Sequence, residues 1–257
     1  MSRSAPLSLS AAALGMLALL STACTRADDG TRPPVLDALQ GQGLEVVDEF
    51  DAGTGLPGTI GHDVRAGGLA EWRLGDVAGA SDLLFLALGT GIAGASVVDG
   101  RMLQAGGYAG EIGHLHVSVA DQSCACGAYG CLETVASAAG VARRFHRTTG
   151  LRRSAQEVAE LARHGDQAAL QAFAVAVAGL AEALAAYAAL LAPEVVTIGG
   201  GLSGAADLIM ADLQQALADR LSFHRRPRLR TAALGSDAGV RGAGLLGWDH
   251  LTAGGRA

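Results

Sequence analysis

Hydrophobic and polar positions along the chain predict alternating strands and helices. Residues 83–88 form a continuous apolar run of strand length, and residues 194–198, rich in β-branched side chains, predict a second strand. Between them, Asp99-Gly100 predicts a hairpin turn joining strands over 95–99 and 101–104, and apolar residues recur with helical spacing over 135–147 and again over 166–191. This alternation is typical of an α/β sheet with helices packed on it.

The longest predicted helix, 166–191, carries alanine and leucine around much of its surface, so we expect it to be largely buried. Glu182 interrupts its most apolar part, which disfavours membrane insertion. Ser154, with Glu157 three residues later, predicts a capping box at the start of the preceding helix.

Composition favours a folded chain of one large domain or two modest ones. Of 257 residues, 50% are hydrophobic and only 17% are charged, so a sizeable core is expected and global disorder is disfavoured. The formal net charge of −6 argues against a nucleic-acid-binding surface.

The first 54 residues raise a separate question. Residues 1–24 combine Arg3, a short apolar run and Ala23-Cys24, a pattern similar to an export signal with a lipoprotein cleavage site, although Ser21 departs from it. Residues 25–54 indicate a polar linker and then irregular sequence. A misassigned start, a frameshifted reading and a true fusion all stay open for this region.

A cluster of potential metal ligands lies in the middle of the chain. Three cysteines in a C-x-C-G-x-x-G-C array follow one histidine, and together these residues make a complete tetrahedral set for structural Zn²⁺: His114, Cys124, Cys126 and Cys131. Gly127 and Gly130 let the backbone turn tightly between the ligands. Buried or disulfide-bonded cysteines are the alternative, but three clustered cysteines leave one unpaired.

Two carboxylates frame this array. Glu111 precedes His114, and Glu133 follows Cys131. If zinc holds one ring nitrogen of the histidine, the other presents an N–H outward. A donor flanked by two acceptors suits a ligand with several hydroxyls, such as a sugar; solvated surface glutamates are the alternative.

The E-x-G-H segment followed by C-x-C-G-x-x-G-C-x-E resembles the signature of the ROK family (repressors, open reading frames and sugar kinases). The resemblance implies that Glu111, His114 and Glu133 contact a sugar and that the histidine–cysteine set binds zinc. It also implies the actin-like ATPase (ribonuclease H-like) fold. This fold is represented over residues 55–257 mainly by the C-terminal lobe, with a truncated or atypical N-terminal lobe.

Asp63 is the candidate general base. It lies near the start of a helical pattern that places Ala66, Leu69, Ala70 and Leu74 on one apolar face. Its carboxylate suits a backbone N–H there, and a helix cap is therefore the structural alternative. In the ROK pattern the matching aspartate accepts the proton of the attacking sugar hydroxyl. His62 replaces the usual asparagine of the pattern, so we expect it to contact the sugar with altered preference.

Two glycine-rich turns follow predicted strands and expose backbone N–H groups suited to a nucleotide, with ordinary tight turns as the alternative. By resemblance, the first is a phosphate-binding motif and the second lies beside the adenosine of ATP. Their residues are Gly89, Thr90 and Gly91, and Gly199, Gly200 and Gly201.

Together these features favour an ATP-dependent, glucokinase-like hexose kinase that uses Mg²⁺ with its ATP. The usual N-terminal Asp-x-Gly-Gly-Thr phosphate loop is not found, so a non-catalytic sugar-binding or degenerate ROK protein is the alternative. Reduced thiols and a nucleotide substrate predict a cytoplasmic protein; export as a lipoprotein through Cys24 is the other reading. The resemblance also allows a homodimer.

Overall fold

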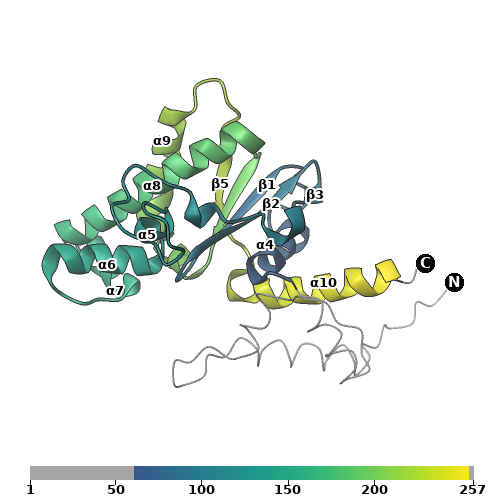
Figure 1. Cartoon of the computed structure of the whole chain (residues 1–257), viewed down its shortest axis with the longest axis horizontal. Coiled ribbons are helices and arrows are strands. Elements are labelled where there is room, and N and C mark those ends of the chain that lie inside the picture. The colour runs from purple at the N-terminus through teal and green to yellow at the C-terminus, as the bar shows by residue number, and fades with distance from the viewer. Residues whose placement is uncertain (1–60, 255–257) are drawn as a thin grey trace, which may run out of the picture.

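A computed structural model describes residues 61–254 of the chain. Within this range, five strands form a mixed sheet in the order β3-β2-β1-β4-β5 (Figure 1). The strands are β1 (Leu83–Leu88), β2 (Ile92–Val98), β3 (Arg101–Met102), β4 (Val195–Gly199) and β5 (Arg228–Thr231). The β1–β2 and β2–β3 pairs are antiparallel, whereas β4 runs parallel to both β1 and β5. Strands β1, β4 and β5 therefore end at the same edge of the sheet.

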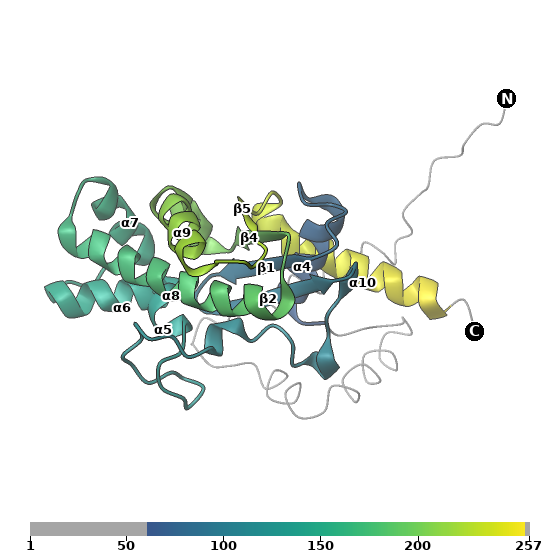
Figure 2. The ribbon, with the colours of Figure 1, turned by 90° about the horizontal axis from the view of Figure 1, so that it is seen from above.

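Helices cover both faces of this sheet (Figures 1 and 2). On one face, α4 (Asp63–Leu74) packs against β1, β2 and α10 (Ala238–Gly254). On the other, α8 is central and contacts the remaining helices. Helix α8 spans Gln167–Leu191, and the helices it contacts are α5 (Glu133–Ala136), α6 (Ala138–Thr149), α7 (Ala155–Arg163) and α9 (Ala206–Arg220). Short 3-10 helices are η1 (Ala105–Gly107), η2 (Ile112–His114), η3 (Gly201–Ala205) and η4 (Gly235–Asp237).

Strand β1 is buried on both faces, as its continuous apolar run predicts. Leu84, Leu86 and Leu88 belong to the large core beneath α8. On the opposite face, the Phe85 ring packs against Gly67 of α4, where a glycine allows close approach. Each fully buried leucine contributes about 1.5–3 kcal/mol by leaving water, so this strand is the hydrophobic centre of the sheet.

Several local predictions are confirmed. Ser154 and Glu157 form the capping box of α7. Asp99 and Gly100 both have positive φ, at 49° and 68°, and form the turn between β2 and β3. The predicted strands around that turn were placed imperfectly, because β2 begins at Ile92 rather than at residue 95 and β3 ends at Met102 rather than at residue 104.

Other predictions need correction. The single helix expected over 135–147 is two helices, α5 and α6, separated at Ser137. The Ser137 hydroxyl donates to the Glu133 carbonyl and accepts the Gly140 N–H, so it ends one helix and caps the next. Leu74, expected on the buried face of α4, is 51% exposed.

Helix α8 is long and apolar enough to cross a membrane by length and composition, with 44% of its most apolar window buried in the fold. Its buried side, which includes Phe173, Leu180 and Leu184, lies in the core. Leu190 is 81% exposed, so burial is less complete than the alanine content suggested. Core helices share this length and composition, so the helix alone is weak evidence for a membrane span.

Glu71 ties α4 to the segment that follows β5. Its side chain is fully buried, and its carboxylate accepts the backbone N–H groups of Ala233 at 3.1 Å and Leu234 at 2.8 Å. Hydrogen bonds to a charged group are stronger than neutral ones. This contact therefore fixes α4 relative to the end of β5.

At Gly200 the segment that follows β4 passes close to the end of β1. The φ of Gly200 is +84°, and a Cβ at this position would lie 2.5 Å from the carbonyl oxygen of Leu88. Both the backbone conformation and the space exclude a side chain.

We expect Gly200→Ala to lower the free energy of unfolding by about 2–4 kcal/mol, through strain at positive φ and displacement of the β1 end. Gly204→Ala is the matched control, because a Cβ there meets open space and should change stability by less than about 0.5 kcal/mol. Urea denaturation of both variants measures the difference, and equal midpoints would contradict the assigned constraint.

Candidate functional site

The two predicted glycine turns lie together at one edge of the sheet. Ala87 of β1 pairs in register with Gly199 of β4. The two turns therefore begin next to each other, at the ends of neighbouring parallel strands. Within the first turn, the Gly89 N–H donates to the Gly91 carbonyl at 2.9 Å. Ligands of open α/β sheets bind outside the carboxyl ends of parallel strands, so the sheet places both turns where a nucleotide would approach.

Glu133 connects the first glycine turn to the cysteine-containing loop. Its Oε2 accepts the Ile92 N–H at 2.9 Å, just beyond the turn. A Cβ at Gly91 would lie 2.5 Å from that oxygen, so glycine leaves room for the carboxylate. The Ala138 N–H also donates to the Gly89 carbonyl at 2.9 Å. Sequence reasoning gave Glu133 to the sugar and did not foresee this contact.

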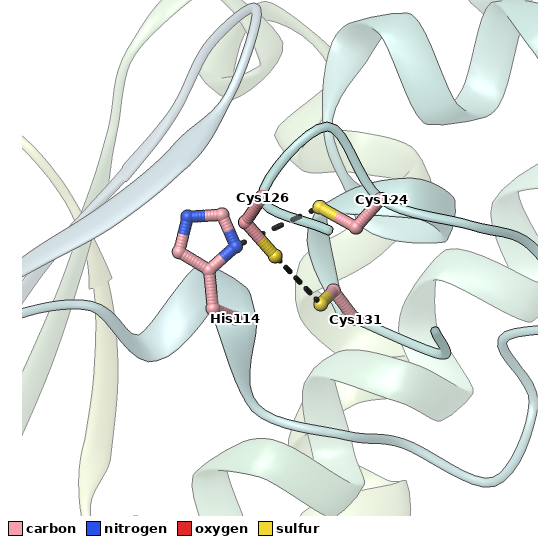
Figure 3. A group of neighbouring side chains, drawn as sticks. All are labelled: His114, Cys124, Cys126 and Cys131. Atoms are coloured by element: carbon pink, nitrogen blue, oxygen red, sulfur yellow. Dashed lines mark hydrogen bonds between the residues drawn. The ribbon is translucent and has the colours of Figure 1, made fainter. Parts of the chain in front are cut away.

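The four predicted metal ligands converge (Figure 3). One potential ligand atom from each of His114, Cys124, Cys126 and Cys131 lies within 4.8 Å of all the others. The His114 Nδ1 is 3.7 Å from the Cys124 sulfur, and the Cys126 and Cys131 sulfurs are 3.7 Å apart. A tetrahedral zinc with Zn–S bonds of about 2.3 Å sets its ligand atoms about 3.8 Å apart. The donor set and its dimensions therefore fit a structural zinc.

Backbone turns hold the cysteines in this arrangement. Gly127 and Gly130 have φ of +92° and +80°, as expected for glycines between ligands. The Cys124 N–H donates to the Ala128 carbonyl at 2.8 Å, which closes the turn that carries Cys124 and Cys126. The three thiols are free rather than disulfide-bonded, so the disulfide alternative does not hold for them.

The thiols differ in how readily they ionise. Burial, followed by hydrogen bonds with Cys126 and Cys124, raises the pKa of Cys131 to about 12. The exposed Cys126 has a lowered pKa, chiefly because the Ala128 N–H donates to its sulfur. A divalent cation would reverse the effect of burial, because a coordinating thiol is deprotonated by the metal.

His114 turns its two ring nitrogens in opposite directions. Nδ1 faces the sulfurs, while Nε2 lies 3.8 Å from the Glu111 carboxylate. Both side chains are accessible, at 35% and 52% exposure. An imidazole nitrogen and a carboxylate therefore lie side by side with both side chains open to solvent, and their contact with a sugar stays a prediction.

Asp63 stands apart from these groups. It is the first residue of α4, is 81% exposed, and accepts the Val64 N–H at 2.8 Å, while His62 occupies the cap position without a side-chain cap. The His62 Nδ1 lies 3.4 Å from the Asp63 carboxylate. Helix α4 runs antiparallel to β1, because Trp72 near its end packs against the cluster that contains Leu83 at the strand's start, whereas Gly67, nearer the helix start, meets Phe85. The start of α4, which carries Asp63, therefore lies toward the edge of the sheet at which β1 and β4 end, and no contact joins Asp63 to the glycine turns.

A pocket of about 330 Å³ adjoins the second glycine turn, and apart from Gly201 the sequence analysis did not identify the residues that line it. Its lining includes Ala138, Gln156, Ala159, Glu160, Arg163 and Gly201. The polar residues lie on the outer face of α7, where charged side chains are ordinary in any helix. Local sequence carried no signal for them.

The chain is similar to known sugar kinases. A glucokinase of Halalkalibacterium halodurans is 35% identical over 221 residues, which are 77% of this chain and 66% of the relative. A glucokinase of Thermotoga maritima is 33% identical over 220 residues, which are 79% and 69% of the two chains. The chain thus spans about two thirds of the length of these curated relatives.

Solved structures agree in fold. A ROK hexokinase from Thermus thermophilus superposes with a TM-score of 0.72 at 30% identity, over 82% of this chain and 73% of the other. A ROK family glucokinase from Streptomyces griseus, in complex with glucose and AMPPNP, gives 0.69 at 27% identity, over 78% and 71%. These neighbours confirm the predicted actin-like ATPase fold.

The family model described as the ROK family matches residues 8–249. The match begins well before residue 55, where the recognisable motifs start, and so extends into the segment that the motifs left unmatched. The candidate signal with Cys24 and the linker lie outside the described residues. Because the match spans most of the sequence, the chain belongs to the ROK family.

Proposed function

We propose that this chain phosphorylates a hexose with ATP, in the manner of the glucokinases it resembles. The observation that supports this best is the hydrogen bond between Glu133 and the Ile92 N–H. It joins the loop that carries the predicted sugar contacts to the turn predicted to bind phosphate. A sugar held by one would therefore lie beside phosphates held by the other.

The sugar-facing groups are Glu111, His114 and Glu133. The Glu111 carboxylate would accept hydrogen bonds from sugar hydroxyls, and the His114 Nε2 would donate its N–H once Nδ1 is bound to the metal. The second Glu133 oxygen is the one available to a hydroxyl, because Oε2 receives the Ile92 N–H. His62 would contribute a further ring nitrogen beside Asp63.

Asp63 is the proposed general base. Its exposed carboxylate, at the edge of the sheet that holds the turns, would accept the proton of the attacking hydroxyl as the phosphoryl group transfers. Catalysis then rests mainly on positioning, because a phosphoryl-transfer enzyme does little covalent chemistry itself.

The phosphates of ATP would lie at residues 89–91 and its adenosine beside residues 199–201. The adenine ring would then occupy the adjoining pocket. Both turns offer backbone N–H groups. Mg²⁺ bound to ATP would neutralise phosphate charge. We assign it no ligands among the described residues, because the turns carry no free set of carboxylates.

Zinc at His114, Cys124, Cys126 and Cys131 is proposed to be structural, since four protein ligands leave no open position. Three reduced thiols and a nucleotide substrate agree with a cytoplasmic protein.

Cys126→Ser should release the metal and lower the free energy of unfolding by more than about 3 kcal/mol, because a structural zinc contributes folding free energy. Ser123→Ala, in the same loop, is the control and should keep both. Metal analysis and thermal melting of purified protein measure the two effects. The zinc site would be refuted if the wild-type protein, freed of metal by a chelator, melted at the same temperature as the untreated protein.

Asp63→Asn should reduce kcat for hexose phosphorylation by about 10²–10⁴, while zinc content and hexose affinity stay unchanged. The control is Asp76→Asn, an exposed aspartate beyond the other end of α4, which should keep full turnover. A coupled assay over a hexose panel, with calorimetry for sugar binding, makes the comparison.

Undiminished turnover in Asp63→Asn would overturn its role as base. Stoichiometric zinc and sugar binding without turnover in the wild type would instead support the sugar-binding protein as the true function.

A further inference from the structure

The pocket beside Gly201 has one polar wall, formed by the exposed face of α7. Gln156 and Glu160 are one helical turn apart on that face, and both line the pocket. Ala138 and Ala159 supply small apolar surface. A pocket that combines apolar surface with a few oriented polar groups is typical of small-molecule recognition.

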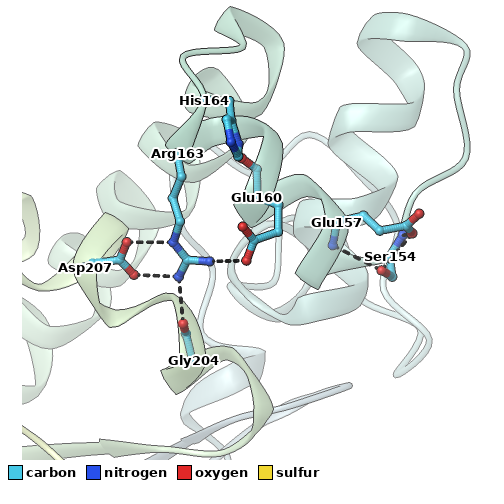
Figure 4. A network of polar contacts seen from close by, with 7 residues as sticks. All are labelled: Ser154, Glu157, Glu160, Arg163, His164, Gly204 and Asp207. Carbon is cyan, nitrogen blue, oxygen red and sulfur yellow. Dashed lines mark hydrogen bonds and ion pairs between the residues drawn. The ribbon is translucent and has the colours of Figure 1, made fainter.

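Arg163 fixes this wall to the opposite side of the pocket (Figure 4). Its guanidinium donates to both carboxylate oxygens of Asp207, at 2.8 and 2.7 Å, and to the Gly204 carbonyl at 2.8 Å. The bidentate pair raises the pKa of Arg163 and lowers that of Asp207. Paired hydrogen bonds of this kind add geometric specificity as well as energy. Helix α7 is thereby joined to η3 and α9, the elements that follow the second glycine turn.

The same guanidinium orients Glu160. The Arg163 Nη1 donates to the Glu160 Oε1 at 2.7 Å. The Glu160 side chain is 56% exposed, and a carboxylate can accept several hydrogen bonds. Arg163 thus holds the Oε1 of Glu160, and the carboxylate still has acceptor positions for a ligand in the pocket.

We propose that Glu160, positioned by Arg163, selects a 6-amino purine nucleotide over a 6-oxo purine nucleotide. This rests on the proposed function, since it assigns the nucleotide base to this pocket. A carboxylate only accepts hydrogen bonds. The amino group of adenine donates to it, whereas the carbonyl oxygen of guanine at the same position would face a negative charge without a proton between them.

The size of the effect follows from exposure. A hydrogen bond to a charged group is strong when buried, but solvent weakens it at a half-exposed site. We expect Glu160 to contribute about a tenfold preference for ATP over GTP.

Competition of ATP and GTP against a fluorescent ATP analogue tests this without requiring turnover. Glu160→Gln should lower the ATP-to-GTP affinity ratio about tenfold, because its amide can donate to a 6-oxo group. Its oxygen still accepts from Arg163, so melting should not change. Arg163→Lys, which keeps the charge but loses the bidentate geometry, should lower the same ratio. Asp212→Asn, an exposed carboxyl on α9, is the control and should leave it unchanged.

An unchanged ratio in Glu160→Gln overturns the proposal. A wild type that binds both nucleotides equally also overturns it. Nucleotide binding without hexose phosphorylation would contradict the kinase proposal, yet the affinity ratios would still decide the role of Glu160. A wild type that binds neither nucleotide would overturn both.

Discussion

The contact between Gly200 and the end of β1 is the constraint on which the edge of the sheet depends. Parallel pairing of β1 and β4 brings their two glycine turns together, but only a residue without Cβ lets the backbone pass Leu88 so closely. A side chain there would separate the turns, and the predicted phosphate and adenosine sites would no longer share one surface. The hydrophobic run of β1 supplies the rigidity, because it is buried between two helical layers.

The cysteine-containing loop has few other means of holding its shape. Between η2 and α5 the chain forms two isolated bridges and no strand or helix, so few of its side chains enter the core. A tetrahedral metal would cross-link residues from both ends of this loop, which is how small irregular segments are commonly stabilised. Glu133 follows the last cysteine by two residues and contacts Ile92. The position of the first glycine turn therefore depends directly on the conformation of the cysteine loop.

Local patterns in the sequence were enough for much of this fold. The apolar runs located β1 and β4, Ser154 with Glu157 located the start of α7, and Asp99-Gly100 located the hairpin. The cysteine spacing and the order of the motifs gave the candidate metal ligands and the family. Each of these features depends on neighbours within a few residues, or on one closely spaced motif.

What could not be predicted depends on contacts between distant segments. The break at Ser137 depends on which hydrogen bonds its hydroxyl makes in the folded chain, and the same residue would be tolerated within a helix. Glu71 looks like any helical glutamate until β5 brings two N–H groups to it. Glu160 and Arg163 are spaced like a surface ion pair, and only the position of η3 turns them into a pocket wall.

The proposed role of Asp63 requires that two layers of the structure keep a fixed relative position. It lies on α4, on the face of the sheet opposite α8, whereas the proposed sugar contacts lie on the cysteine loop and at the start of α5. A displacement of about 1 Å between catalytic groups can cost a hundredfold in rate, so the two layers must be held in fixed relation. Two features of α4 meet that demand. Gly67 and Gly68 allow the helix to approach β1 and β2 more closely than larger residues would, and the buried Glu71 carboxylate fixes it to the end of β5. The glycines and the glutamate of this helix thus set the position of Asp63 without touching a substrate. The sheet, which packs against both layers, fixes Asp63 relative to the proposed sugar contacts.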